Sequence, residues 1–166
     1  MVDISKAWRQ PLRRIYLVWG VILLVGFALT AYGFQDGWLH WYPLATIGIL
    51  SQIIKQRLTD YRAKTLLIMW AIISLAGTYY SHQLMIGGLE FPTYFTSFAI
   101  FWLWIMSIPQ FITGIIMKSK FQMGLGIFWF ALSIAFKNMF QLDETTMALI
   151  TAAVTGLPYL YIAFKK

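Results

Sequence analysis

Six long apolar stretches, separated by short polar loops, constrain the fold of this chain more than any other feature. A helix that spans the hydrocarbon of a bilayer needs about 20 apolar residues, with a range of roughly 17–25. Two stretches are shorter, but flanking side chains such as Lys55 can snorkel to the headgroups. We therefore expect an all-α, polytopic membrane helix bundle with about six transmembrane helices. The stretches are Ile15–Phe34, Trp41–Ile54, Thr65–Ser81, Thr93–Met117, Gly124–Phe136 and Met147–Phe164.

The scarcity of charge agrees with a membrane environment. Only 11% of the residues are charged and 60% are apolar, whereas a soluble domain carries about 25% charged residues. So few charges could not cover the apolar surface of a soluble chain, but a bilayer needs no such cover. The net charge of +7 does not indicate nucleic-acid binding, because the basic residues lie in short clusters between apolar stretches. The predicted partner is the lipid bilayer.

Basic residues separate between the two sides of the predicted bundle. Twelve of the 13 lysines and arginines lie at the chain ends or in the loops after the second and fourth stretches. Only Lys137 falls on the other side, which carries four of the six acidic residues. The positive-inside rule then places the N- and C-termini in the cytoplasm. The expected location is integral to a membrane, the plasma (inner) membrane.

Aromatic residues gather at the predicted non-cytoplasmic edges of the bundle. Because amphipathic rings favour the headgroup region, we expect them to form a belt at that surface. The residues are Trp38, Trp41, Tyr42, Tyr79, Tyr80 and Tyr94.

Residues suited to catalysis or metal binding are scarce. The chain has no cysteine, which excludes thiolate metal sites and cysteine nucleophiles. Its serines have no neighbouring base and no nucleophile-elbow pattern, so we predict no catalytic residue and no enzyme activity. His40 and His82 both fall in outer loops, where interfacial hydrogen bonding is favoured over a metal or haem site. We therefore predict no metal and no cofactor.

Three prolines lie in the second, fourth and sixth stretches, which all run from outside to inside. They are Pro43, Pro109 and Pro158. Each removes a backbone donor and can kink its helix. Such kinks can serve as flexing points for alternating access, and many are static packing features.

Several short motifs follow one another in order between residues 98 and 166. Pro109-Gln110 stands late in a predicted helix, and Lys118-Ser119 follows in a short basic turn. Gly124 then precedes the aromatic-rich Phe128-Trp129-Phe130. This order resembles a triple-helix unit of the PQ-loop family, which includes the SWEET and SemiSWEET sugar transporters. The resemblance implies a hinge or motif role for Pro109, Gln110, Lys118, Ser119 and Gly124.

The first half of the chain resembles an incomplete copy of the same unit. Phe34-Gln35-Asp36 lies before a stretch that ends in Lys55-Gln56-Arg57, and Phe140-Gln141-Leu142-Asp143 echoes it later. The resemblance implies a single membrane domain, 1–166, with three parts. These are a first, incomplete repeat (1–64), a connecting helix with its outer loop (65–92) and a SWEET-like triple-helix unit (93–166).

The chain departs from the family where a sugar would bind. The family's pocket uses a tryptophan and an asparagine, one on each of the last two helices of a unit. Ile134-Ala135-Phe136 and Ile150-Thr151-Ala152 occupy the corresponding positions, so neither residue is present. The resemblance therefore carries the fold better than the function. The candidate substrate-pocket residues are Phe136, Asn138 and Thr151.

Two functions of different classes follow from these patterns. The first is a small-solute membrane carrier of PQ-loop type, which binds a small polar solute near the bilayer midplane between its halves. The alternative is a non-catalytic accessory subunit of a larger membrane complex. In that case the eight tryptophans and eight methionines would pack against partners or other copies of the chain.

Overall fold

The chain is all-helical over the part that the structure describes. The structure, a computed structural model, describes residues 4–32, 39–55, 61–85, 98–138 and 143–164. The prediction of an all-α bundle is confirmed for these residues. The six helices that they form are α1 (Ile4–Ala31), α2 (Trp41–Lys55), α3 (Tyr61–Met85), α4 (Phe98–Ile116), α5 (Lys120–Asn138) and α6 (Glu144–Phe164).

Three of these helices are long and apolar enough to cross a membrane. The qualifying segments are Arg13–Ala31, Phe98–Ile116 and Thr145–Phe164. The apolar helix α2 is shorter, since its 15 residues rise only about 22 Å, against a hydrocarbon core of roughly 30 Å. The three long helices support the prediction of a membrane protein, and a six-fold crossing stays a prediction.

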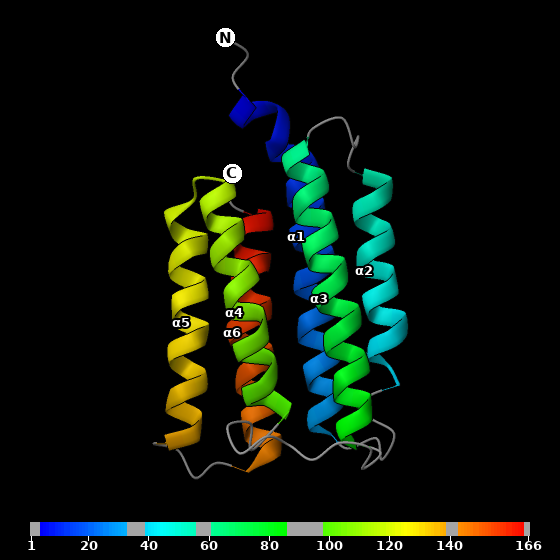
Figure 1. The fold of residues 1–166 in the computed structure, drawn as a ribbon, viewed down its shortest axis with the longest axis vertical. Helices are drawn as coiled ribbons and strands as arrows, with labels where there is room; N and C mark the ends of the chain where they lie inside the picture. Colours follow the sequence, from blue (N-terminus) through cyan, green and yellow to red (C-terminus); the bar gives the residue numbers. More distant parts are fainter. Residues whose placement is uncertain (1–3, 33–38, 56–60, 86–97, 139–142, 165–166) are drawn as a thin grey trace.

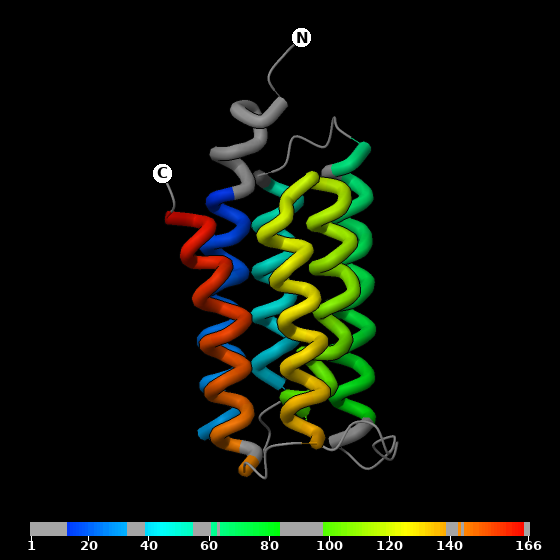
Figure 2. The backbone as a smooth tube through the Cα atoms, turned by 90° about the vertical axis from the view of Figure 1, so that its left-hand side faces the viewer, coloured from blue at the N-terminus to red at the C-terminus, as the bar shows by residue number. Residues whose placement is uncertain are grey.

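The helices lie side by side and alternate in direction, so that α1 begins and α6 ends at the same end of the bundle (Figure 1). The first and last helices, α1 and α6, pack along each other (Figure 2). Further contacts of α1 with α2, α2 with α3, α3 with α4 and α4 with α6 complete a ring of five helices. Helix α5 lies outside this ring and packs mainly along α4. The ring encloses a cavity.

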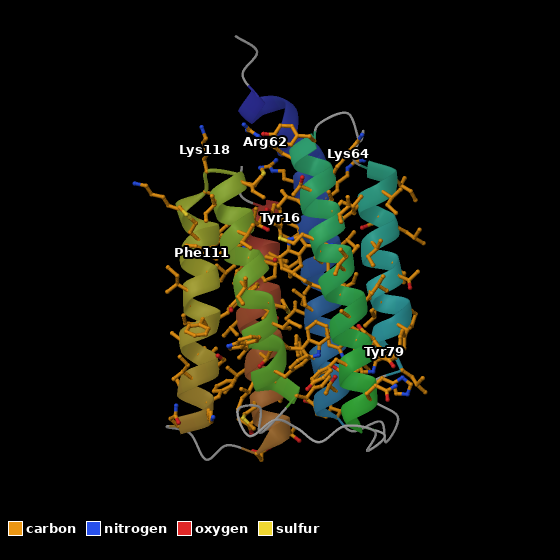
Figure 3. The ribbon with its side chains drawn as sticks, in the orientation of Figure 1. Tyr16, Arg62, Lys64, Tyr79, Phe111 and Lys118 are labelled. Carbon is orange, nitrogen blue, oxygen red and sulfur yellow. The ribbon has the colours of Figure 1, made fainter. Side chains whose placement is uncertain are left out.

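Basic side chains mark one end of the bundle, called here the basic end. Figure 3 shows Arg62, Lys64 and Lys118 together at this end. Lys120, the first residue of α5, lies at the same end, and Arg13 and Arg14 lie in the half of α1 nearer to it. Among the described lysines and arginines whose exposure is given, Lys137 alone lies at the opposite end.

Glycines let two pairs of helices approach backbone to backbone. A Cβ atom at Gly20 of α1 would lie 3.1 Å from the Gly156 carbonyl oxygen of α6, and one at Gly156 would lie 2.9 Å from the Gly20 carbonyl oxygen. A Cβ at Gly126 of α5 would lie 2.7 Å from both the Ser107 carbonyl oxygen and the Phe111 nitrogen of α4. Lipid supplies no hydrophobic force between helices, so close contact at small residues is what stabilises such pairs.

Asp143 caps the start of α6. Its carboxylate accepts hydrogen bonds from the Thr146 backbone nitrogen (2.9 Å) and hydroxyl (2.6 Å), which satisfies a donor of the first turn. These bonds, the hydroxyl bond first, lower the pKa of the Asp143 carboxyl below its usual value.

The described residues bear on only part of the predicted internal repeat. The motif Phe34-Gln35-Asp36, its echo Phe140-Gln141-Leu142 and the proposed boundary at 92/93 lie outside them. Helix α3 begins at Tyr61, inside the segment assigned to the first repeat. This helix is a member of the ring, in contact with both α2 and α4.

The glycine contact between α4 and α5 gives a first prediction. We expect Gly126→Ala to destabilise the fold by about 1–3 kcal/mol, because the new methyl group meets backbone atoms that only a helix shift can move. Gly124→Ala is the matched control: it adds the same methyl where nothing lies within 4 Å. It should leave stability unchanged or raise it by up to about 1 kcal/mol. Denaturation of the purified variants in detergent measures both, and equal effects would contradict the packing described.

Candidate functional site

A cavity of about 70 Å³ lies inside the ring. Its walls come from α1, α2, α3, α4 and α6, while α5 contributes none of the described lining residues. On α3 the lining runs from Leu66 to Thr78, a distance of about 18 Å along the helix axis. So small a volume over such a length is a narrow slot that follows the bundle axis.

Four tryptophans from four different helices line this slot. Three of them lie against a glycine of a neighbouring helix: Trp19 on Gly48, Trp41 on Gly26 and Trp102 on Gly77. A Cβ atom at any of these glycines would come within 3 Å of the indole ring. Each glycine therefore leaves the space that an indole ring occupies, and these contacts fix the spacing of α1 with α2 and of α3 with α4. The fourth ring is Trp70.

Two of these rings form the wall of the slot nearest the end opposite the basic end. Trp41 and Trp102 stack with their ring centroids 5.6 Å apart and their planes 15° from parallel. The Trp41 indole donates a hydrogen bond to the Thr30 hydroxyl (3.2 Å), and the Trp102 indole donates one to the Ser81 hydroxyl (3.1 Å). Trp41 is only 4% exposed. Its predicted place in a headgroup belt is therefore wrong, because its N–H finds a partner inside the protein.

Polar atoms without partners are concentrated in this slot. Among the described residues, five buried side-chain nitrogen or oxygen atoms have no hydrogen-bond partner. Four of the five belong to the slot walls, one from each of α1, α2, α3 and α4: Trp19 Nε1, Gln52 Oε1, Thr78 Oγ1 and Gln110 Nε2. Leaving such a group unpaired costs roughly 1–3 kcal/mol. A polar occupant of the slot would remove this cost.

A cluster of four polar side chains lies toward the basic end of the slot. The Tyr159 hydroxyl donates to Gln110 Oε1 (2.6 Å), and Gln122 Nε2 donates to the Tyr16 hydroxyl. The Tyr16 and Tyr159 rings meet edge to face with centroids 5.3 Å apart. The cluster joins α1, α4, α5 and α6. It also holds the Gln110 amide in place, so that its Nε2 is the group left unpaired.

Pro109 is buried in the interior of α4, next to the cavity residue Gln110. It has no N–H, so the Ile105 carbonyl lacks its usual helical donor. The next turn is tied instead through side chains. Thr113 donates its hydroxyl to the Pro109 carbonyl (2.7 Å) and accepts from the Trp70 indole of α3 (3.0 Å).

The other two prolines differ in position. Pro158 lies inside α6. Pro43 is the third residue of α2, where a backbone N–H would have no helical acceptor. The prediction that Pro43 can kink its helix is therefore wrong, because a proline in the first turn removes no helical hydrogen bond.

The predicted Lys118-Ser119 motif forms the turn between α4 and α5. The Ser119 nitrogen donates to the Gly114 carbonyl (2.8 Å) and the Lys118 nitrogen to the Ile115 carbonyl (3.1 Å), the pattern of a Schellman helix end. Lys118 has a φ of 52°, in the left-handed region. The Ser119 hydroxyl then accepts from the Gln122 nitrogen (3.4 Å) and caps α5. The motif therefore stops one helix and starts the next.

The residues predicted to form a substrate pocket do not line the described slot. Phe136 is buried on α5, and the Asn138 amide is exposed and donates to the Ile134 carbonyl (3.0 Å). Thr151 is fully buried on α6, and its hydroxyl donates to the Met147 carbonyl (2.8 Å). The structure separates these three side chains from the slot because α5 lies outside the ring and Thr151 bonds to its own helix.

The two histidines make hydrogen bonds at the end opposite the basic end. His40 Nε2 contacts the Gly26 carbonyl oxygen (2.9 Å), and His82 Nδ1 shares a hydrogen bond with the Tyr42 hydroxyl (3.0 Å). Burial lowers the pKa of His40, while the bond to the Gly26 carbonyl acts in the opposite direction. Within the described ranges, no group of three His, Asp or Glu side chains is placed to hold a metal ion.

Comparisons with protein-family models, with curated proteins and with solved structures returned no match. The class of protein is therefore described from the fold and the slot alone. The chain is all-helical over its described residues, with three helices suited to a membrane and a narrow central slot with unpaired polar groups in its walls.

The turn between α4 and α5 gives a second prediction. We expect Lys118→Gly to stabilise the fold by about 1 kcal/mol, because glycine adopts a positive φ without the steric cost that a side chain meets there. Lys118→Ala removes the same charge and keeps that cost, so it should not stabilise. Thermal unfolding in detergent compares the two. Equal stabilisation by both would show that the charge, not the backbone, is responsible.

Proposed function

We propose that this chain is an integral membrane protein that crosses the bilayer six times with both termini in the cytoplasm. Support for six crossings comes from the bundle, in which α2, α3 and α5 run alongside the three long apolar helices (Figure 1). Support for the orientation comes from the basic end, which the positive-inside rule assigns to the cytoplasm. We expect the membrane to be the plasma (inner) membrane.

Within that membrane, we propose that the chain is a carrier for a small polar solute. The observation that carries this proposal is the slot with four unpaired polar atoms, contributed by four different helices. A packed structural core would satisfy such atoms or replace them with apolar ones. A solute that enters the slot can satisfy them in turn, which is the requirement for a binding site between helices of a carrier.

The position of the Pro-Gln pair favours a carrier of PQ-loop type. Gln110 supplies a wall of the slot, and Pro109 precedes it at the point where α4 lacks a helical hydrogen bond. A helix weakened beside a binding site is a suitable place for flexing between inward and outward states. The resemblance and the slot thus point to the same residues.

The accessory-subunit alternative rested on tryptophans and methionines that could pack against partners, and the tryptophans bear on it most directly. Among the tryptophans whose burial is described, Trp104 alone is exposed, at 38%. The others face the interior, and four of them line the slot. This arrangement gives the tryptophans a role within the chain, and it favours the carrier.

Uptake by the purified protein tests the carrier. We expect proteoliposomes with the wild-type chain to take up small polar solutes faster than protein-free liposomes. Pro109→Ala should restore the missing hydrogen bond and stiffen α4, so stability holds or rises while uptake slows several-fold. Uptake by Pro109→Ala at the wild-type rate would remove the hinge role from this proline, and no uptake by a folded wild-type protein would remove the carrier.

The six-fold crossing is tested by labelling, which is clean because the chain has no cysteine. Single cysteines placed at positions 60 and 119 should stay inaccessible to an impermeant thiol reagent in intact cells. Cysteines at 37, 88 and 143 should react. All five should react after the membrane is permeabilised. The inverse pattern would reverse the orientation, and a mixed pattern within either group would change the number of crossings.

A further inference from the structure

The slot has a chemical character that restricts what it can bind. None of the described residues that line it carries a charge at neutral pH: the polar ones are tryptophan, glutamine, serine, threonine and tyrosine. An ion that enters a cavity without a counter-charge loses its hydration and gains nothing comparable. A neutral molecule loses much less. The walls therefore select against ions.

The unpaired atoms favour an occupant that both donates and accepts hydrogen bonds. Trp19 Nε1 and Gln110 Nε2 are donors, and Gln52 Oε1 is an acceptor. The Thr78 hydroxyl can act as either. An occupant with only acceptors or only donors would leave part of this set unpaired, at the cost of a buried unsatisfied group.

The dimensions of the slot exclude rings. Its volume of about 70 Å³ is less than half of the roughly 150 Å³ that accommodates a benzene molecule in a protein interior. The lining extends over about 18 Å, so the cross-section is narrow. A hexose is larger than benzene and does not fit. A slender molecule well below benzene in volume, such as urea, does.

From these three properties we propose that the slot binds slender, uncharged solutes of urea size, and that it rejects ions and hexoses. The shared chemistry is a small neutral molecule that has hydrogen-bond donors and acceptors along its length. This inference rests on the proposed carrier function and names its substrate class.

Polar groups at two levels along the slot provide such a solute with two binding positions. Thr78 lies in the part of α3 nearest the Trp41–Trp102 stack, whereas Gln52 and Gln110 lie toward the basic end of their helices. Leu23, Ile73 and Met106 line the slot as well and bind nothing polar. Binding at separate weak sites, without one deep site, lets a solute both enter and leave.

Stopped-flow light scattering of proteoliposomes measures the selectivity directly. Vesicles that contain the full chain are mixed with urea, glucose, sodium chloride or potassium chloride, and the rate of re-swelling reports solute entry. We expect urea to enter faster than in protein-free vesicles. Glucose and both salts should enter no faster than in protein-free vesicles.

Two variants test whether the slot is the route. Thr78→Val and Gln52→Leu remove polar atoms that have no partner, so the fold should be as stable as the wild type or more so. Entry of urea should fall roughly five-fold, as expected for the loss of one hydrogen bond. Thr155→Val is the matched control. Thr155 is fully buried, donates within its own helix and does not line the slot, so the rate of entry should not change.

The outcomes separate the two proposals. Entry of glucose or of either salt at a rate equal to that of urea would overturn the substrate class and leave the carrier standing. Wild-type entry that Thr78→Val and Gln52→Leu both leave unchanged would overturn the slot as the site. If no solute enters and the protein is folded by circular dichroism, the carrier and the substrate class both fall.

Discussion

The rest of this structure depends on one constraint. Its helices must approach closely at glycines, because lipid supplies no hydrophobic force between them. Gly20 with Gly156, and Gly126 against α4, bring helix backbones within contact distance. These contacts fix two helix pairs, α1 with α6 and α4 with α5. The other helices pack against these pairs. Helices α2 and α3 then join them through indole rings that lie on glycines, which are again contacts between a large and a small residue.

The slot is a consequence of that mode of packing. An indole ring is rigid and planar, so a ring packed on a glycine sets the distance between two helices. Smaller neighbouring side chains do not completely fill the space that this distance leaves. The ring of five helices therefore keeps a narrow space along its axis, and the polar atoms of four helices border it. Packing and the slot are connected here: the same tryptophans that space the helices form the walls of the slot.

Hydropathy predicted the helices well, because burial in lipid and burial in protein both demand apolar residues. It could not tell which face of a helix meets a neighbour. Trp41 illustrates this: its position near a membrane edge suits the headgroup region, but the indole instead donates to Thr30 and faces the slot. The Lys118-Ser119 pair was recognised as a motif, whereas its role as a left-handed helix end required the backbone conformation.

The candidate site was predictable only in part. Gln110 was found through its motif. Gln52 and Thr78 could have been found as polar side chains within apolar stretches, since such residues turn away from lipid. Trp19 required the structure, because nothing in its sequence context distinguishes it from a lipid-facing ring. The family-based candidates Phe136, Asn138 and Thr151 were carried over by helix order, which does not specify which helices close the ring.

The pairing of the first helix with the last has a consequence for biosynthesis. Roughly 110 residues separate the end of α1 from the start of α6, and at about 5–20 residues per second their synthesis takes on the order of 10 s. During that interval the Gly20 face of α1 has no native partner, and the ring stays open on that side. The slot is thus enclosed only when α6 is added, and a nascent chain released before α6 would carry the other wall helices without an enclosed slot.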